Sequence, residues 1–320
     1  TTVIGLTDSE HTGDNGMRMN KAFRMNGVGQ VIGVSDRFAG DDWTGQSAWI
    51  YDGATTTRMG LTDGVHSTSS GFQHSDVRSI SEGGRAIGLS ERYTPSGEYR
   101  GQSVWMHYEG TTRQLGFTGG IYEAENGFSY TEFFEFFEED ITSGNPSFNS
   151  RLNDIGMTAG KSQRYGSGGG YTTWLYDWDT DQTISLVLST QSTGFSNTGV
   201  TYMGNDGTVL GTYTLFSESN VNLGDRAFYF SMEHGLHDLG SLVDGVLDDN
   251  GWQFLQFATS ANELGHIIGL GRAAFATTTN FAYILKPANT NPIPEPSTLA
   301  FFAMGLVSLA VLARRRNRKA

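Results

Sequence analysis

Short runs of apolar and polar residues fill residues 1–287 and recur with a period near 55 residues. Each repeat carries two glycines four positions apart with apolar residues between them. The pairs are Gly29–Gly33, Gly84–Gly88, Gly156–Gly160, Gly207–Gly211 and Gly265–Gly269. An Asn, Ser or Gly stands three residues before each pair, which predicts a tight turn that leads into a strand. A second strand, centred on a large aromatic, follows each pair; the aromatics are Trp49, Trp105, Trp174, Phe228 and Tyr283.

A third strand follows the aromatic strand after a turn at Gly or Asp. Its internal copies are Thr56–Leu61, Thr111–Phe117, Gln182–Leu186 and Leu236–Gly240. Residues 1–8 match the same element, and His11 then falls opposite His66. Segments such as Ser75–Ile80 leave room for one more strand before each turn. Each unit therefore holds about four short strands.

Five consecutive units of this kind predict an all-β fold, a β-propeller of about five four-stranded blades over residues 1–287. Residues 1–8 would supply the fourth strand of the last blade and close the ring without an exposed edge. A longer parent protein that lacks an N-terminal blade is the alternative, because residue 1 falls at the start of a strand.

The repeat units resemble the bacterial extracellular repeats called HAF repeats, which share an Asn-Asp-x-Gly-x-x-x-Gly core and a Leu-Gly strand. Where that family has His-Ala-Phe, this chain has Ser-Ala-Trp, Ser-Val-Trp or Arg-Ala-Phe. The resemblance implies a repeat fold and export, and it carries no known chemistry.

The last thirty residues have a different composition. Residues 288–298 contain Pro294-Glu295-Pro296 and predict a stiff, extended linker. Residues 299–313 carry no charge and would form a helix about 22 Å long, short for a hydrocarbon core of roughly 30 Å. We predict a single transmembrane helix with a basic cytoplasmic end in residues 299–320. The apolar anchors are Leu299, Phe301, Phe302, Leu306, Val307, Leu309, Val311 and Leu312, and the topology-setting cations are Arg314, Arg315, Arg316, Arg318 and Lys319.

This order of Pro-Glu-Pro, short apolar helix and Arg-rich end resembles the PEP-CTERM sorting signal of bacterial surface and secreted proteins. The resemblance implies a transient anchor in the inner membrane, cleavage by an exosortase near Pro294, Glu295 and Pro296, and delivery to the cell surface or extracellular matrix. An ordinary C-terminal anchor with a proline-rich neck is the alternative. Such a signal also implies an N-terminal secretory signal. Thr1-Thr2-Val3-Ile4 is not one, so the signal has been removed or the sequence is a fragment.

Charge and cysteine content narrow the possible partners. Residues 1–313 hold 16 Lys and Arg against 34 Asp and Glu, a net charge of −18, which argues against binding to nucleic acid. The chain has no cysteine, which excludes disulfides, thiolate chemistry and Cys-based zinc sites. Stability outside the cell must therefore come from a large core.

A Ser-acid-Arg or Ser-Gln-Arg motif followed by an aromatic recurs in three units and contains the candidate ligand-binding residues. These are Arg37, Arg92, Arg164, Tyr93 and Tyr165. Recurrence favours packing or ion pairing between blades, because a catalytic group is usually needed once. The alternative is a multivalent surface in which each Arg and aromatic pair binds one unit of a polysaccharide.

Other chemistry is weakly indicated. Asp177, Asp179 and Asp181 have the spacing of a calcium loop, but Gln182 replaces the glycine and Leu188 the final glutamate, so a polar turn is favoured. No cofactor is expected. The seven histidines do not cluster, and no hydrolase elbow or nucleotide motif occurs. The third unit has an insertion rich in Phe and Glu near residues 130–140, which we expect to form a helical turn or strand pair that caps the disc or binds a partner.

These observations predict a non-enzymatic, exported protein of the cell envelope or exopolysaccharide matrix. Its expected partners are an exosortase-type processing enzyme, transiently the inner membrane, and a polysaccharide or surface protein. A propeller glycoside hydrolase or lyase, with paired carboxylates on the innermost strands, is the alternative. The strands that precede the turn of each unit would be the innermost ones, and Asp76 is almost the only carboxylate on them.

Overall fold

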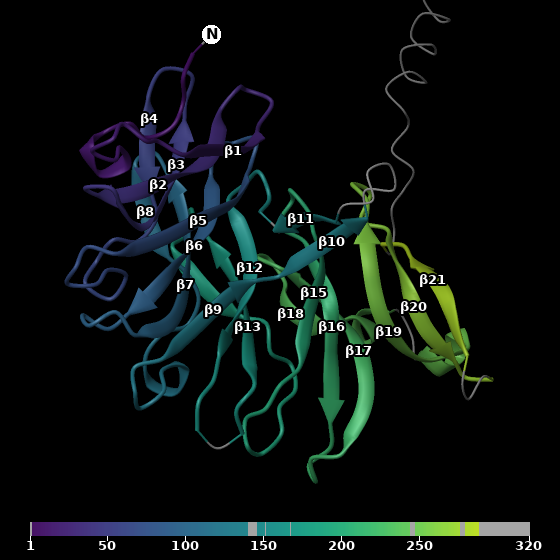
Figure 1. Cartoon of the computed structure of the whole chain (residues 1–320). Helices are drawn as coiled ribbons and strands as arrows, with labels where there is room; N and C mark the ends of the chain where they lie inside the picture. The colour runs from purple at the N-terminus through teal and green to yellow at the C-terminus, as the bar shows by residue number, and fades with distance from the viewer. Residues whose placement is uncertain are drawn as a thin grey trace, which may run out of the picture.

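The computed structural model describes residues 2–139, 146–150, 152–166, 168–243, 247–275 and 279–287 (Figure 1). The predicted linker, membrane helix and basic end, residues 288–320, lie outside this range. Among the described residues, none of the helices is both long enough and apolar enough to cross a membrane. The described chain is almost entirely β-structure, which confirms the predicted all-β class.

The strands fall into five consecutive units, each an antiparallel meander. Unit 1 has β1 (Asn20–Met25), β2 (Val31–Ala39), β3 (Asp42–Tyr51) and β4 (Thr56–Met59). Unit 2 has β5 (Gln73–Ile80), β6 (Ala86–Tyr93), β7 (Tyr99–Tyr108) and β8 (Thr111–Gln114). Unit 3 has β9 (Ser129–Phe133), β12 (Met157–Gln163), β13 (Tyr171–Asp177) and β14 (Gln182–Ser185).

Unit 4 has β15 (Thr198–Met203), β16 (Val209–Phe216), β17 (Asn222–Ser231) and β18 (Gly235–Asp238). Over the residues that the structure describes, unit 5 has three strands, β19 (Trp252–Ala261), β20 (Ile267–Ala273) and β21 (Asn280–Leu285). The insertion of unit 3 is a strand pair, β10 (Glu135–Glu139) with β11 (Pro146–Ser150), as one of the two predicted forms. Short 3-10 turns cover Ser9–His11, Gly120–Tyr122, Leu239–Leu242 and Leu247–Asn250.

The hydrophobic core is divided among the four junctions between consecutive units. At the first junction Ile32, Ala48 and Ile50 of unit 1 meet Trp105 of unit 2. The other three junctions have the same composition, with aliphatic side chains of one unit against a large ring of the next. The rings are Trp174, Phe228 and Tyr283. Units 2, 3 and 4 therefore bury one face against the preceding unit and the other against the following unit, as expected for a repeat protein.

The paired glycines of the sequence have separate structural roles. Gly84, the first of its pair, has φ of 81°, a left-handed conformation that the turn before β6 requires. Gly88, the second, lies under the Trp105 ring and beside the carbonyl oxygen of Asp76, so an added Cβ would overlap both. The same geometry recurs at Gly33, Gly160 and Gly211. The motif thus makes a turn and then a flat seat for the aromatic ring.

The predicted closure of the ring by the N-terminal residues is wrong for this structure. Residues 2–8 form no strand and lie on unit 1, where the Leu6 amide donates to Ser35 Oγ at 3.0 Å. Within the described ranges no strand pairing joins unit 1 to unit 5, and the two units lie at opposite sides of the molecule (Figure 1). The amide of Gly5 likewise donates to a hydroxyl of unit 1, Thr56 Oγ1, so two backbone donors of this segment find their acceptors there and not on unit 5.

We predict that Gly88→Ala lowers the free energy of unfolding by about 1–3 kcal/mol, because the new methyl group overpacks the seat of Trp105. Urea denaturation followed by tryptophan fluorescence measures this loss. Gly64→Ala is the control, since nothing lies within 4 Å of its Cβ position, and it should change stability by less than about 0.5 kcal/mol. Equal losses in the two variants would contradict the assigned role of Gly88.

Candidate functional site

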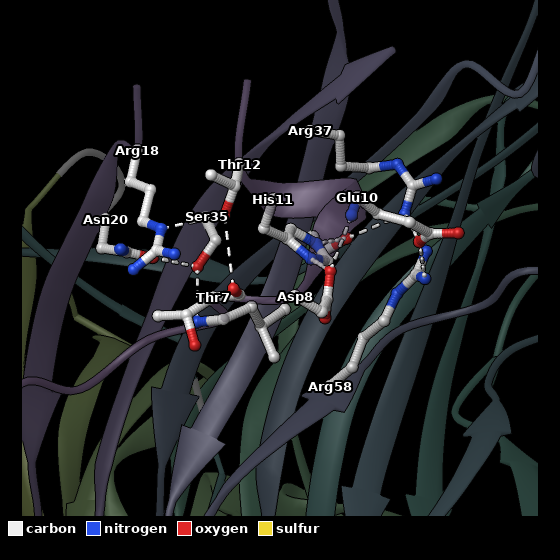
Figure 2. Close-up of polar contacts among 12 residues, drawn as sticks. Thr7, Asp8, Glu10, His11, Thr12, Arg18, Asn20, Ser35, Arg37 and Arg58 are labelled. Carbon is white, nitrogen blue, oxygen red and sulfur yellow. Dashed lines mark hydrogen bonds and ion pairs between the residues drawn. The ribbon is translucent and has the colours of Figure 1, made fainter. Parts of the chain in front are cut away.

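Two copies of an Asp–His–Ser network lie where a connecting segment docks on a unit. In unit 1 His11 Nδ1 is 2.6 Å from Asp8 Oδ1, and its Nε2 is 3.0 Å from Ser47 Oγ. Figure 2 shows His11 and Asp8 facing each other beside Glu10 and Arg37. The second copy joins Asp63, His66 and Ser103 with distances of 2.7 and 2.9 Å. In unit 3 the corresponding contact is reduced to a hydrogen bond from Tyr122 to Thr172.

Burial and hydrogen bonding set the charges of these networks. Burial lowers the pKa of His66 below its ordinary 6.5, and the hydrogen bond and negative charge of Asp63 oppose this shift only in part. Burial is the largest single influence and tends to raise the pKa of Asp63, but the hydrogen bond and charge of His66 and the backbone amides of Val65 and His66 together outweigh it, so the pKa falls below 3.8. His11 and Asp8 shift in the same directions. The network thus joins a neutral imidazole to a carboxylate and a hydroxyl.

This geometry has the connectivity of a hydrolase triad but not its accessibility. Ser47 and Ser103 are fully buried, so no substrate carbonyl can reach either hydroxyl. Ser103 also accepts from Gln114 Nε2 at 3.2 Å, which further occupies its oxygen. We conclude that the networks fasten the connecting segments onto the sheet. The alignment of His11 with His66 was visible in the sequence, whereas their serine partners, two residues before Trp49 and Trp105, were not recognised.

The three predicted ligand-binding arginines contact protein groups. Arg37 is buried and donates to Glu10 Oε2 at 2.8 Å. Arg92 Nη1 lies 3.5 Å from Ser103 Oγ, and Arg164 donates to the carbonyl of Gly194. These contacts favour the packing interpretation of the recurring Arg. A direct role of the arginines in ligand binding remains a prediction.

A ladder of six aromatic rings crosses units 1, 2 and 3. It consists of Trp43, Phe72, Tyr93, Tyr99, Phe128 and Tyr165. Successive centroids are 5.3 to 6.2 Å apart and the planes meet at 71° to 85°, so every contact is edge to face. Three equivalent positions each supply two of these rings. Trp43 and Tyr99 stand at the start of β3 and β7, Phe72 and Phe128 directly before β5 and β9, and Tyr93 and Tyr165 at or just after the end of β6 and β12. The ladder is therefore continuous across unit boundaries.

Two rings of this ladder are open to solvent. Trp43 is 52% exposed and Tyr99 is 44% exposed, and they occupy equivalent positions in units 1 and 2. Tyr93, one of the two predicted ligand-binding tyrosines, is buried and donates its hydroxyl to Glu91. Burial, and then the nearby Tyr171 and Tyr99, raise the pKa of Tyr165, the other one, to about 12. The exposed rings were missed in the sequence because their partners come from neighbouring units.

The carboxylates on the described first strands, Asp76 and Glu132, each belong to an ion pair. Asp76 lies 3.3 Å from Arg78, and Glu132 lies 2.8 Å from Lys161. Glu132, Lys161 and Arg78 line a cavity of about 350 Å³ between units 2 and 3, together with Gln102 and Tyr130. The sequence analysis named Asp76 on these strands but not Glu132.

A second cavity, of about 710 Å³, lies between units 4 and 5. Its apolar lining includes Tyr229, Leu239, Ile267 and Leu285, and Lys286 lies at its margin. Its lining does not include the ladder residues or the ion-paired carboxylates of the first strands.

The candidate calcium loop is occupied by protein contacts. Asp177 accepts from the amide of Asp179 at 3.1 Å, and Asp179 pairs with Arg85 of unit 2 at 3.0 Å. Asp181 accepts from the Tyr176 hydroxyl at 2.7 Å. Within the described parts of the chain, no three His, Asp or Glu side chains are grouped to hold a metal ion. The loop joins unit 3 to unit 2.

Residues 292–317 match the PEP-CTERM protein-sorting motif, which confirms the predicted resemblance of the tail. Such a motif is recognised by an exosortase and marks a protein that is exported and sorted to the cell surface. The match contains Pro294, Glu295 and Pro296. The resemblance of the repeat units to HAF repeats remains a prediction.

The search of curated proteins returned no match. Among solved structures, the chain is similar to TolB from Acinetobacter baumannii (TM-score 0.30, 11% identity, 76% of this chain and 49% of that chain). It is also similar to the β-propeller domain of the trilobed protease from Pyrococcus furiosus (0.30, 6%, 69% and 51%) and to an endo-arabinanase from Bacillus licheniformis (0.24, 11%, 88% and 95%). The chain spans about half the length of the first two.

We predict that the free energy of unfolding falls as pH drops below about 6.5. His66 and His11 have lowered pKa values in the folded chain, so at such pH the unfolded chain binds protons that the folded chain does not. His66→Gln should cost about 1–3 kcal/mol at pH 7.5 and should reduce the loss between pH 7.5 and 5.5. Urea denaturation at both pH values measures this. His234→Gln, at an exposed position, is the control and should retain the wild-type pH dependence. An unchanged slope in His66→Gln would refute the linkage.

Proposed function

We propose that the chain is a surface-sorted protein whose repeat array binds polysaccharide and does not cleave it. The observation that carries this proposal is the aromatic ladder with Trp43 and Tyr99 exposed at equivalent positions. A ring fixed edge to face by its neighbours loses little entropy when a sugar stacks on it. Two such rings on one rigid array can engage two units of one polymer, so weak contacts combine through effective concentration.

The first-strand carboxylates support a non-catalytic role. A glycosidase needs one carboxyl group that is protonated and available as the general acid, beside a second one that is ionised. Asp76 lies 3.3 Å from Arg78 and Glu132 lies 2.8 Å from Lys161, so each carboxyl group is engaged by a cation, and the two stand on the first strands of different units. The glycoside hydrolase or lyase therefore remains the less favoured alternative.

The tail supplies the location in this proposal. Residues 299–313 would hold the exported chain in the inner membrane until an exosortase cuts near Glu295, with the array outside. Release would then place the ladder in contact with surface or matrix glycans. A ring closed from five blades is not required for this function, because the ladder lies entirely within units 1, 2 and 3.

We predict that Trp43→Ala and Tyr99→Ala each weaken binding to a matrix polysaccharide by about tenfold, and that the double variant loses more than either. Purified full-length protein in a mild detergent, titrated against a panel of immobilised polysaccharides, measures this. Phe275→Ala removes an exposed ring of unit 5 and is the matched control. Wild-type binding in both single variants and in the double variant would refute the ladder as the binding surface.

We also predict that replacement of Pro294, Glu295 and Pro296 by alanine blocks processing in cells that express the matching exosortase. The unprocessed form should remain larger and membrane-bound in immunoblots of fractionated cells, because the recognition element is lost. Alanine replacement of the nearby Asn289, Thr290 and Asn291 is the control and should leave processing intact. Normal release of the Pro-Glu-Pro variant would exclude the motif as the processing signal.

A further inference from the structure

At every junction, the same face of one unit packs against the following unit. This face presents an aliphatic residue just before the second glycine of the pair and, from the next strand, the residues that flank the junction aromatic, such as Ala48 and Ile50 in unit 1. In units 1 to 4 the first position holds Ile32, Ile87, Ala159 and Leu210, and all four are fully buried against the next unit. The aromatic ring of that next unit completes each contact. This face is therefore a standard interface within the chain.

In unit 5 the same face is uncovered. Ile268 is the residue equivalent to Ile32, and Ile284 is equivalent to Ile50; they are 47% and 56% exposed. They lie opposite each other on β20 and β21. Leu270, on the same face, is also exposed. The equivalent surface is buried against the following unit in units 1 to 4. The exposed apolar surface of unit 5 is therefore an interface that lacks its partner surface.

The edge of unit 5 is open as well. β21 pairs with β20, and no strand among the described residues pairs with its other side. In unit 1 the equivalent strand β3 is followed by β4, with Thr57 opposite Ile50. A strand that added to β21 in the same register would bring a residue opposite Ile284.

Residues 2–4 of the chain match the missing strand. Leu6 and His11 dock on unit 1 as Leu61 and His66 dock on unit 2, through Ser35 and Ser47 in the first case and through Ser90 and Ser103 in the second. The residues just before Leu61 are β4, whereas those before Leu6 have no strand partner, and Val3 is 83% exposed. In this register Thr2 corresponds to Thr57.

We propose that unit 5 binds a second copy of this chain, whose residues 2–4 add to β21 as a fourth strand while its unit 1 covers Ile268 and Ile284. Residues 2–4 of the same chain do not pair with its own β21, because units 1 and 5 lie at opposite sides of the molecule (Figure 1). The contact is head to tail and joins different surfaces, so it builds chains or rings of copies.

Single cysteines test this register, since the protein has no cysteine of its own. Full-length Thr2→Cys and Ile284→Cys, carrying tags of different size, are mixed in mild detergent and oxidised. Directly opposed residues of antiparallel strands are within disulfide range. We expect a reducible heterodimer on non-reducing gels. Leu264→Cys is the control, because this exposed residue of the same unit stands in the turn between β19 and β20 and not opposite the added strand; it should give at most a tenth of that product with Thr2→Cys.

A second variant separates docking from chance collision. Ile268→Asp, combined with Ile284→Cys, should lower the yield with Thr2→Cys by roughly tenfold, because the interface would bury an unpaired charge. Ile268 is exposed in a single copy, so the melting curve of this variant should stay unchanged. Equal yields with the control, or no heterodimer, would overturn the proposal. So would a Thr2→Cys/Ile284→Cys double variant that forms only a disulfide within one chain.

Discussion

The seating of one large aromatic ring on a glycine, at the junction of two consecutive units, is the contact on which the rest of the structure depends. Trp105 covers Gly88 and at the same time fills the junction with unit 1. A side chain at position 88 would displace both the ring and the neighbouring strand. Since hydrophobic burial is the main favourable term in folding, each unit is stable only when its neighbours are present. This explains why a chain without cysteines holds an extended array together.

The junctions also decide which polar groups are buried. Each connecting segment has to cross from the last strand of one unit to the first strand of the next, and its backbone and side chains need partners there. His66 and Ser103 satisfy this need inside the fold. Their arrangement has the appearance of catalytic machinery, but its cause is the cost of leaving a buried hydroxyl or imidazole unpaired. The rings of Trp43 and Tyr99, by contrast, stay exposed to solvent outside these buried networks.

Much of this fold could be predicted because it repeats. The Gly-x-x-x-Gly turns and the rings Trp49, Trp105 and Trp174 specify strands, turns and unit boundaries from local sequence alone. Contacts between units could not be predicted in the same way. Ser103 becomes a partner of His66 only after the segment has docked, and residues 2–8 resemble a strand yet find hydroxyl partners on unit 1. The ladder was missed for the same reason, since four of its five contacts join residues that are far apart in the sequence, and only Tyr93 and Tyr99 belong to one hairpin.

The length of the ladder follows from two glycines of unit 3. Gly168 takes the place of Trp43 and Tyr99, six residues before the junction aromatic Trp174. An added Cβ at Gly170 would meet the ring of Phe195, so the chain there packs too closely for a further side chain. Phe195 and Phe216 continue the pattern in unit 4 as a separate pair, 6.0 Å apart. The aromatic ladder therefore extends over units 1, 2 and 3. It ends in unit 3 because a glycine replaces one ring there, so the ladder has a definite length although the units themselves continue.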